Sequence, residues 1–372
     1  MNGRERLLKT FNGESVDRIP VSLYEFDGFY DSWIYNYPEY AEILEYAKGK
    51  TDKMYFWRPE GNKPSFLWGE VEKEMIDYTT WEEKKAVHTK TTIKTPLGEI
   101  SDHTRADEGV HTSWTIENFC KDIKDAERLL SIPYIPSKPD VSSFSEKDRK
   151  VGEEGILMAD TPDPLCSTVE MFGFTKFLMV YMENPEIIFK LMKFFHERIF
   201  NNLEHLLKNG AVTIYRIVGP EYATPPYLRP EEFDKLVTPF DKELVSLLHR
   251  YGAKARLHSH GRIKKALNSF LEMGIDATDP VEPPPDGDVS LRDARETLGE
   301  KCVLIGNIEE RLFEVGSKKD MEEAVKKAMD DAAGKGPFVL CPTAMPLTTP
   351  LDKKIQENII HYIDSGIKYG KL

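Results

Sequence analysis

From about residue 150 onward, short runs of apolar and β-branched residues alternate with long segments in which apolar and polar positions repeat with the period of a helix. Short apolar runs are typical of buried strands, and the longer periodic segments are typical of amphipathic helices. The predicted strands are 155–160, 212–219, 254–260, 275–282, 302–308 and 337–343. Strands and helices that alternate in this way predict parallel βα units.

Three segments between these runs predict helices. The segment 184–210 starts at Asn184, a residue type favoured at helix N-caps, and stops at Gly210. The segments 229–252 and 317–336 also close on glycine. Each helix therefore has a recognisable end before the next predicted strand.

So many βα units in series favour an α/β fold of the (β/α)8 TIM barrel type over an open doubly wound sheet. The run DRIPVSLYEF, residues 17–26, is then the first strand of the barrel. Residues 31–150 are less regular, although HTKTTIKTPLGEISDHTR predicts a hairpin around its Thr-Pro-Leu-Gly turn. We predict a single domain, 1–372, in which 31–150 form an elaborated N-terminal region over the barrel mouth.

Composition narrows the class of protein. The 372 residues are 40% hydrophobic, which is enough for a large core, and no apolar run approaches the roughly 20 residues that span a bilayer. The N-terminus lacks the apolar core of a signal peptide, so the prediction is a cytoplasmic protein without membrane contact. A net charge of −13 argues against nucleic acid as a partner, because phosphate binding needs clustered Lys and Arg. The four cysteines are far apart and contain no CxxC, which indicates neither a disulfide framework nor a zinc ribbon.

Polar residues follow nearly every predicted strand. In parallel barrels the catalytic and binding residues lie at the C-terminal ends of the strands, while residues inside the strands pack the core. The groups at these ends are Glu25, Asp27, Asp160, Glu221, His258, His260, Asp279, Glu282, Asn307 and Cys341.

The stretch RLHSHGRI carries two histidines one residue apart. Side chains repeat with period two along a strand, so His258 and His260 are expected on one face, where they can share an ion. Two imidazoles and the thiolate of Cys341 suit zinc, and Glu221 is a candidate fourth ligand. The alternatives are a solvated polar strand end for the histidines and a small buried apolar position for Cys341.

Aromatic residues are dense between positions 24 and 40. They either roof the barrel or form a stacking wall for a flat substrate beside the metal. The candidates for substrate contact are Tyr24, Phe26, Phe29, Tyr30 and Asn307. Histidines on predicted helices (His196, His205, His249 and His361) are expected at the surface or in helix packing, whereas His88, His103 and His111 have no predicted place.

Taken together, several segments resemble the uroporphyrinogen decarboxylase superfamily. The segments are RERLLKTFNGESVDRIPV, LHSHG, DPVE, GNIE and PLTTPLDKKIQENI, which together extend over nearly the whole chain. In that superfamily the decarboxylases are metal-free and bind porphyrinogen acetates through an Arg-Gln-Ala-Gly-Arg segment after the first strand. Here that place reads EFDGFYD, so a polyanionic tetrapyrrole substrate is not expected.

The other branch of the superfamily contains zinc methyltransferases that exchange methyl groups with a corrinoid, and they carry His-x-Cys-Gly and a later Cys. This chain matches at His258 and Cys341, but His260 stands in place of the middle cysteine. Replacing an anionic sulfur by a neutral nitrogen makes the metal a stronger Lewis acid, which favours activation of a methyl donor through oxygen.

The resemblance therefore implies an O-demethylating methyltransferase. Zinc held by His258, His260, Cys341 and Glu221 would act on a methoxylated, often aromatic, small molecule. The methyl group would pass to the cobalamin of a separate corrinoid protein. Glu25, Asp27 and Tyr222 are the candidate catalytic groups that donate a proton or position the ring, and relatives imply a monomer or homodimer.

Three other functions stay open from the sequence. One is methyl transfer from methylcobalamin to a thiol such as coenzyme M, and another is a metal-free decarboxylation of some other acid. The third is a non-enzymatic protein that binds a corrinoid or small molecule.

Overall fold

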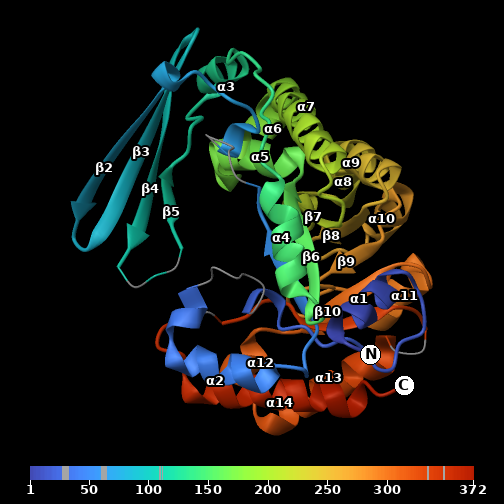
Figure 1. Ribbon diagram of the computed structural model, residues 1–372. Coiled ribbons are helices and arrows are strands. Elements are labelled where there is room, and N and C mark those ends of the chain that lie inside the picture. The colour runs from blue at the N-terminus through green and yellow to red at the C-terminus, as the bar shows by residue number, and fades with distance from the viewer. Residues whose placement is uncertain (27–32, 60–64, 109, 111, 333–334, 347) are drawn as a thin grey trace. The chain divides into compact units, whose positions relative to one another are not determined.

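The computed structural model describes the whole chain except residues 27–32, 60–64, 109, 111, 333–334 and 347 (Figure 1). The chain divides into two compact units. The first contains residues Met1–Arg58, Ser142–Thr161 and Ala211–Leu372, and the second contains Pro59–Val141 and Pro162–Gly210. The prediction of a single domain stays a prediction, and each unit is described by itself.

The first unit is built on a parallel sheet of seven strands in the order β1-β6-β7-β8-β9-β10-β11. Its strands are β1 (Lys53–Trp57), β6 (Gly155–Pro162), β7 (Ile214–Val218), β8 (Lys254–His258), β9 (Ala277–Asp279), β10 (Val303–Ile308) and β11 (Phe338–Pro342). All six strands predicted after residue 150 are present. Strand β1 was missed, and it lies inside the range 31–150 that we expected to be irregular.

The predicted first strand, 17–26, is not a named strand of this sheet. One parallel bridge joins Val21 to Leu340 of β11, and the backbone N–H of Asp52, just before β1, donates to the carbonyl of Val21 at 2.8 Å. Pro20 has no N–H to extend the ladder, which limits the pairing. The sheet is therefore shown as seven parallel strands, and the closed eight-stranded barrel stays a prediction.

Helices connect and cover these strands. The segment predicted as one helix at 229–252 forms two, α8 (Pro230–Leu236) and α9 (Thr238–Arg250), and Pro239 at the start of α9 explains the break. Helices α13 and α14 pack against each other, and α14 also packs on α2 (Figure 1). The helices of this unit apart from α8 and α9 are α1 (Gly3–Phe11), α2 (Pro38–Ala47), α4 (Ser142–Val151), α10 (Leu267–Met273), α11 (Leu291–Leu298), α12 (Arg311–Glu314), α13 (Lys318–Ala332) and α14 (Lys353–Tyr369).

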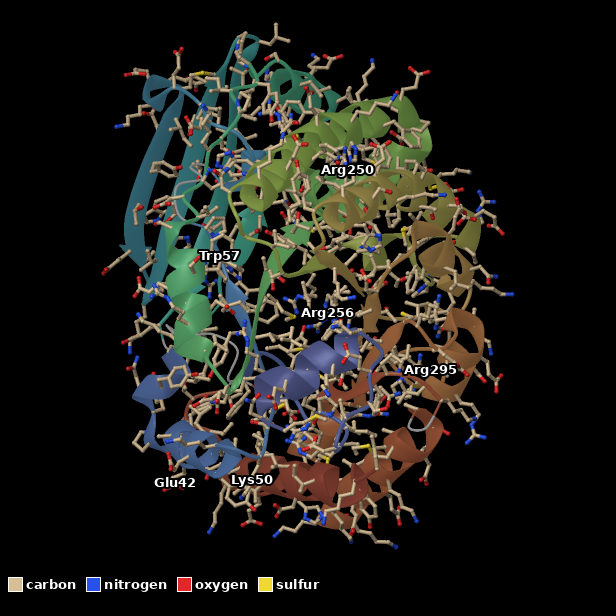
Figure 2. All side chains as sticks on the ribbon, turned by 45° about the vertical axis from the view of Figure 1, so that its right-hand side comes forward. Glu42, Lys50, Trp57, Arg250, Arg256 and Arg295 are labelled. Atoms are coloured by element: carbon tan, nitrogen blue, oxygen red, sulfur yellow. The ribbon has the colours of Figure 1, made fainter. Side chains whose placement is uncertain are left out.

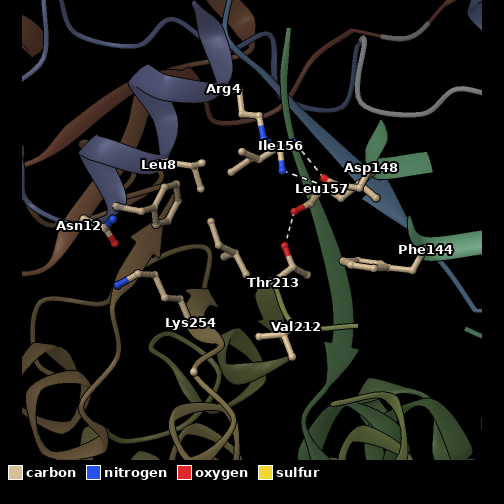
Figure 3. A pocket seen from close by; sticks show the side chains of 13 residues that line it. Arg4, Leu8, Asn12, Phe144, Asp148, Ile156, Leu157, Val212, Thr213 and Lys254 are labelled. Atoms are coloured by element: carbon tan, nitrogen blue, oxygen red, sulfur yellow. Dashed lines mark hydrogen bonds and ion pairs between the residues drawn. The ribbon is translucent and has the colours of Figure 1, made fainter. Parts of the chain in front are cut away.

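Ion pairs fasten the N-terminal helix to the rest of the first unit. Arg6 of α1 binds Asp17 at 2.7 Å and Asp52 at 2.5 Å. Helix α1 also borders a cavity of about 280 Å³ at the start of strands β6, β7 and β8, where Arg4 makes a two-point ion pair with Asp148 (Figure 3). This cavity lies at the N-terminal ends of the strands, whereas catalytic residues of parallel barrels lie at the C-terminal ends. Its lining residues are therefore expected to contribute to stability and not to catalysis.

The Arg6–Asp17 pair gives an expected pH dependence. The hydrogen bond from Arg6 holds the pKa of the Asp17 carboxyl well below its usual range. The ionised carboxylate therefore stabilises the fold above about pH 4, and this contribution is lost as the pH falls below that value. Asp17→Asn should lower the free energy of unfolding at pH 7 by at most about 1 kcal/mol, because the carboxylate is 40% exposed. Urea titrations at pH 7 and pH 3 test this, and an undiminished pH dependence in the variant would contradict it.

The second unit contains an antiparallel sheet in the order β2-β3-β4-β5, together with helices. The hairpin predicted around Thr-Pro-Leu-Gly is confirmed, because β3 and β4 pair from Ala86↔Asp107 to Thr95↔Gly98. The helix predicted at 184–210 is α7, with Asn184 at its N-cap. The elements are β2 (Ile76–Glu83), β3 (Ala86–Thr95), β4 (Gly98–Asp107), β5 (Trp114–Glu117), α3 (Ile123–Leu130), α5 (Pro164–Phe172), α6 (Phe174–Glu183) and α7 (Pro185–Lys208). Among the described helices of both units, none is both long enough and apolar enough to cross a bilayer.

Candidate active site

Four neighbouring strands of the parallel sheet carry two arginines flanked on both sides by a carboxylate. Arg216 of β7 binds Asp160 of β6 at 2.9 and 3.0 Å. Arg256 of β8, labelled in Figure 2, binds Asp279 of β9 at 2.6 and 2.7 Å, and both of these side chains are almost completely buried. Arg216 and Arg256 are register partners on the adjacent strands β7 and β8. Each is neutralised by a carboxylate on its other neighbouring strand, β6 for Arg216 and β9 for Arg256. Two-point pairing of this kind fixes both partners in one orientation.

His258 ends β8, directly opposite Asp279 in the register of β8 and β9. Its Nδ1 lies 2.7 Å from the Asp279 carboxylate, which also holds Arg256. Burial raises the pKa of Asp279, but the charges of Arg256 and His258 and their hydrogen bonds outweigh burial and hold the pKa well below its usual range. In the neutral form of His258, an ionised Asp279 keeps the proton on Nδ1, and Nε2 is then the nitrogen that carries a lone pair.

His260 lies two residues beyond, past the end of β8, and is held in the same manner. Its Nδ1 is 2.7 Å from Glu282, whose other oxygen accepts the backbone N–H of Gly261 at 2.6 Å. Burial lowers the pKa of His260, but the hydrogen bond and charge of Glu282 outweigh it and raise the pKa above its usual value. The rings of His258 and His260 meet edge to face with centroids 4.7 Å apart. The structure therefore brings the two predicted imidazoles together.

Cys341 lies on β11 and is 1% exposed. Burial raises the pKa of its thiol to about 12, although the nearby charge of Arg256 lowers it and that of Asp279 raises it further. The side chain packs in the core cluster of the parallel sheet. Its neighbours match the buried apolar alternative that the sequence left open for this residue.

Glu221 and Tyr222 lie in the 3-10 turn η5 (Pro220–Ala223) that follows β7, and both are half-buried. Glu221 accepts the backbone N–H of Gly219 at 3.2 Å. Its charge contributes to the raised pKa of His260, which places the carboxylate in the electrostatic surroundings of that ring.

Two of the aromatic residues predicted to contact substrate, Tyr24 and Phe26, lie in different environments. Tyr24 accepts a hydrogen bond from Arg216 at 3.0 Å and stacks toward His258 with ring centroids 6.4 Å apart. Phe26 is fully buried against Tyr40, a core position and not a place on an open substrate wall.

Asn307 of β10 is the register partner of Cys341 and donates to the Val281 carbonyl at 3.1 Å. The structure does not describe the side chains of four other candidate site residues. Asp27, Phe29 and Tyr30 lie outside the described residues, and so does the side chain of Glu25.

The predicted metal site can be tested against the donors that are present. Both imidazoles are oriented at Nδ1 by a carboxylate, as is typical of metal-binding histidines, and this part of the donor set fits. Among the described residues, however, no group of three or more His, Cys, Asp or Glu side chains is arranged to hold an ion. The structure thus pairs His258 with His260, and Cys341 and Glu221 stay predicted ligands.

A cavity of about 390 Å³ opens beside His260. Arg311 lines it and is neutralised by Glu309 at 2.7 Å. The carboxyl groups in its lining are those of Glu282, Asp286, Glu309, Glu310 and Glu314. Such a lining repels an anion, which bears on the charge of any small molecule that enters next to His260.

Sequence reasoning missed the two buried arginines. A signal was present, because Arg216 and Arg256 each interrupt a run of apolar residues that reads as a buried strand. A charge inside such a strand has to be paired, so each arginine implied a carboxylate on a neighbouring strand.

Comparisons with known proteins give a family and a fold. The model of the uroporphyrinogen decarboxylase (URO-D) family matches residues 148–355. A methyltransferase from Methanosarcina mazei superposes with a TM-score of 0.61 at 15% identity, covering 99% of this chain and 99% of its own. At this identity the likeness concerns the fold.

Two other solved structures are less similar. A D-psicose 3-epimerase from Clostridium cellulolyticum H10, solved with D-tagatose, has a TM-score of 0.33 at 12% identity and covers 62% of this chain and 93% of its own. A D-psicose 3-epimerase in the presence of D-fructose has a TM-score of 0.32 at 9% identity and covers 60% and 92%. No curated protein matches the chain.

Proposed function

Because this chain belongs to the uroporphyrinogen decarboxylase family, we propose that it is a methyltransferase of that family and that its active site is built around His258 and His260. The observation that carries the proposal is the pair of imidazoles, 4.7 Å apart and each fixed at Nδ1 by its own carboxylate. The full-length likeness in fold to a methanogen methyltransferase supports the choice of chemistry.

The finer proposal is O-demethylation of a methoxylated compound, with a corrinoid protein as the methyl acceptor and zinc as the metal. His258 and His260 would hold the zinc, and Cys341 and Glu221 stay predicted ligands. Zinc bound there supplies a Lewis acid that stabilises negative charge on the leaving oxygen. Asp279 and Glu282 keep both rings in the tautomer that presents Nε2.

The remaining residues act on the substrate side. Tyr24, fixed by Arg216, offers an aromatic face beside His258 against which a flat donor can stack. Asp279, itself fixed by the buried Arg256, holds the His258 ring in one orientation through Nδ1. The acidic cavity beside His260 selects against anions, so we propose a neutral or cationic methyl donor and not a methoxybenzoate.

Methyl transfer to reduced cobalamin, followed by its absorbance, tests this function. Three methoxylated donors of different charge are compared: a methoxybenzoate, a neutral methoxyphenol and a cationic methoxybenzylamine. We expect turnover with a neutral or cationic donor, and loss of turnover after chelation. Full activity of chelated His258→Ala protein would overturn the proposal. Thiol-dependent consumption of methylcobalamin, or release of CO2 by the chelated protein, would instead identify one of the rival reactions.

A further inference from the structure

The antiparallel sheet of the second unit carries two histidines that had no predicted place. His88 of β3 lies opposite Arg105, and His103 of β4 lies opposite Lys90, so the two histidines are diagonal neighbours on one face of the sheet. Their facing nitrogens, Nδ1 of His88 and Nε2 of His103, are 2.8 Å apart. Both side chains are half-buried and reachable from solvent.

Trp81 of β2 holds both rings in place. It is the register partner of His88 and stacks on it with centroids 5.2 Å apart and an angle of 13°. It also stacks on His103 at 5.1 Å and 30°. One indole therefore covers one side of both imidazoles, which limits their rotation and leaves the two nitrogens facing each other.

We propose that His88 and His103 bind a divalent late first-row transition metal through these two nitrogens. Metal–nitrogen bonds are about 2.0–2.1 Å long, so two nitrogens on one ion lie about 2.9 Å apart at a right angle and about 3.4 Å apart at a tetrahedral angle. The observed 2.8 Å is close to the first of these distances, and each ring has to turn in its own plane, along the face of Trp81, so that both lone pairs point at the ion. The proton now between the rings moves to the far nitrogen of its own ring, so neutral histidines bind the ion without net proton loss.

Surrounding charges set the affinity and the choice of metal. Glu117 of β5 is the register partner of His103, and its exposed carboxylate lies 3.9 Å from Lys121, so these two charges largely offset each other near the pair. Lys90 repels a cation, whereas Arg105 is neutralised by Asp107 at 2.7 Å. A half-buried imidazole pair of this kind selects Cu2+ over Ni2+ and Zn2+ and does not bind Mg2+ or Ca2+.

Titration of the full chain with CuCl2 and NiCl2, followed by tryptophan fluorescence, tests the proposal. All titrations use protein that carries His260→Ala, because this substitution removes the His258–His260 pair as a competing metal site. We expect one ion to quench Trp81, and His88→Gln or His103→Gln to weaken binding at least about tenfold, since changes that merely orient a ligand already cost that much. Trp81→Phe should lose most of the quenching while calorimetry still detects the ion.

Two further variants separate a metal site from a hydrogen-bonded pair that only supports the sheet. Lys90→Gln leaves the stacked rings in place and should strengthen binding about two- to fivefold by removing a repelling charge. His249→Gln removes a surface imidazole elsewhere, paired with Asp276, and should change nothing. Copper binding that is unaltered in the double variant His88→Gln/His103→Gln, or that requires millimolar copper, would overturn the proposal. Neither result depends on the proposed methyl transfer.

Discussion

Replacing Asp279 by asparagine is expected to lower the free energy of unfolding by about 3–5 kcal/mol, the cost of breaking a buried ion pair from one side. The carboxylate accepts two hydrogen bonds from Arg256 and one contact from His258 Nδ1, and all three side chains are buried. An asparagine offers one acceptor oxygen for these donors and leaves the Arg256 charge without compensation. Urea unfolding at pH 7, with the slope checked for two-state behaviour, measures the loss.

Asp160→Asn is the matched control for this prediction. Asp160 binds Arg216 in the same two-point geometry one strand pair away, but its side chain is 22% exposed, so water can replace part of the lost interaction. The control should therefore lose clearly less stability than Asp279→Asn. Equal losses would show that burial does not set the cost. The double variant Arg256→Met/Asp279→Leu removes both charges and should recover part of the stability lost by Asp279→Asn.

The strands of the parallel sheet were predictable because both faces of such a sheet are covered, and the sequence then shows short continuous apolar runs. Strand β6, for example, is GILMADTP, and its first five residues are buried. The order and register of the strands were not predictable, because parallel neighbours are brought together by packing and not by a local turn. The segment 17–26 illustrates this limit, since its apolar pattern is that of a strand but its pairing stops at a single bridge.

The candidate site, too, was only partly predictable from the sequence. The period of a strand correctly brought His258 and His260 together, although His260 lies beyond the end of β8 and its ring meets the other edge to face. Their partners, Asp279 and Glu282, were visible only as polar groups after a strand. Knowing that Asp279 faces His258 requires the register of β8 and β9. The sequence alone did not show that Cys341 packs in the core.

Loss of His258 is expected to abolish the proposed activity, with kcat/KM for methyl transfer reduced at least about 100-fold. Changing residues that only orient a metal ligand costs about 10–100-fold in affinity or activity, so removal of the ligand itself should cost more. His258→Ala and His260→Ala should each lower the zinc content of purified protein to a small fraction of the wild-type value. Metal analysis together with the methyl-transfer assay measures both effects.

Two variants decide whether such losses arise from metal binding. Glu282→Gln keeps the shape of the side chain but weakens its hold on His260 Nδ1, so zinc affinity should fall about 10–100-fold while added zinc restores activity. His249→Gln breaks a surface pair in which Nε2 lies 2.8 Å from Asp276, and it should leave zinc content and activity unchanged. If His258→Ala lost activity while retaining full zinc content, the imidazole would act on the substrate directly. In that case Asp279 would orient a catalytic base and not a metal ligand, and other residues would have to hold the zinc.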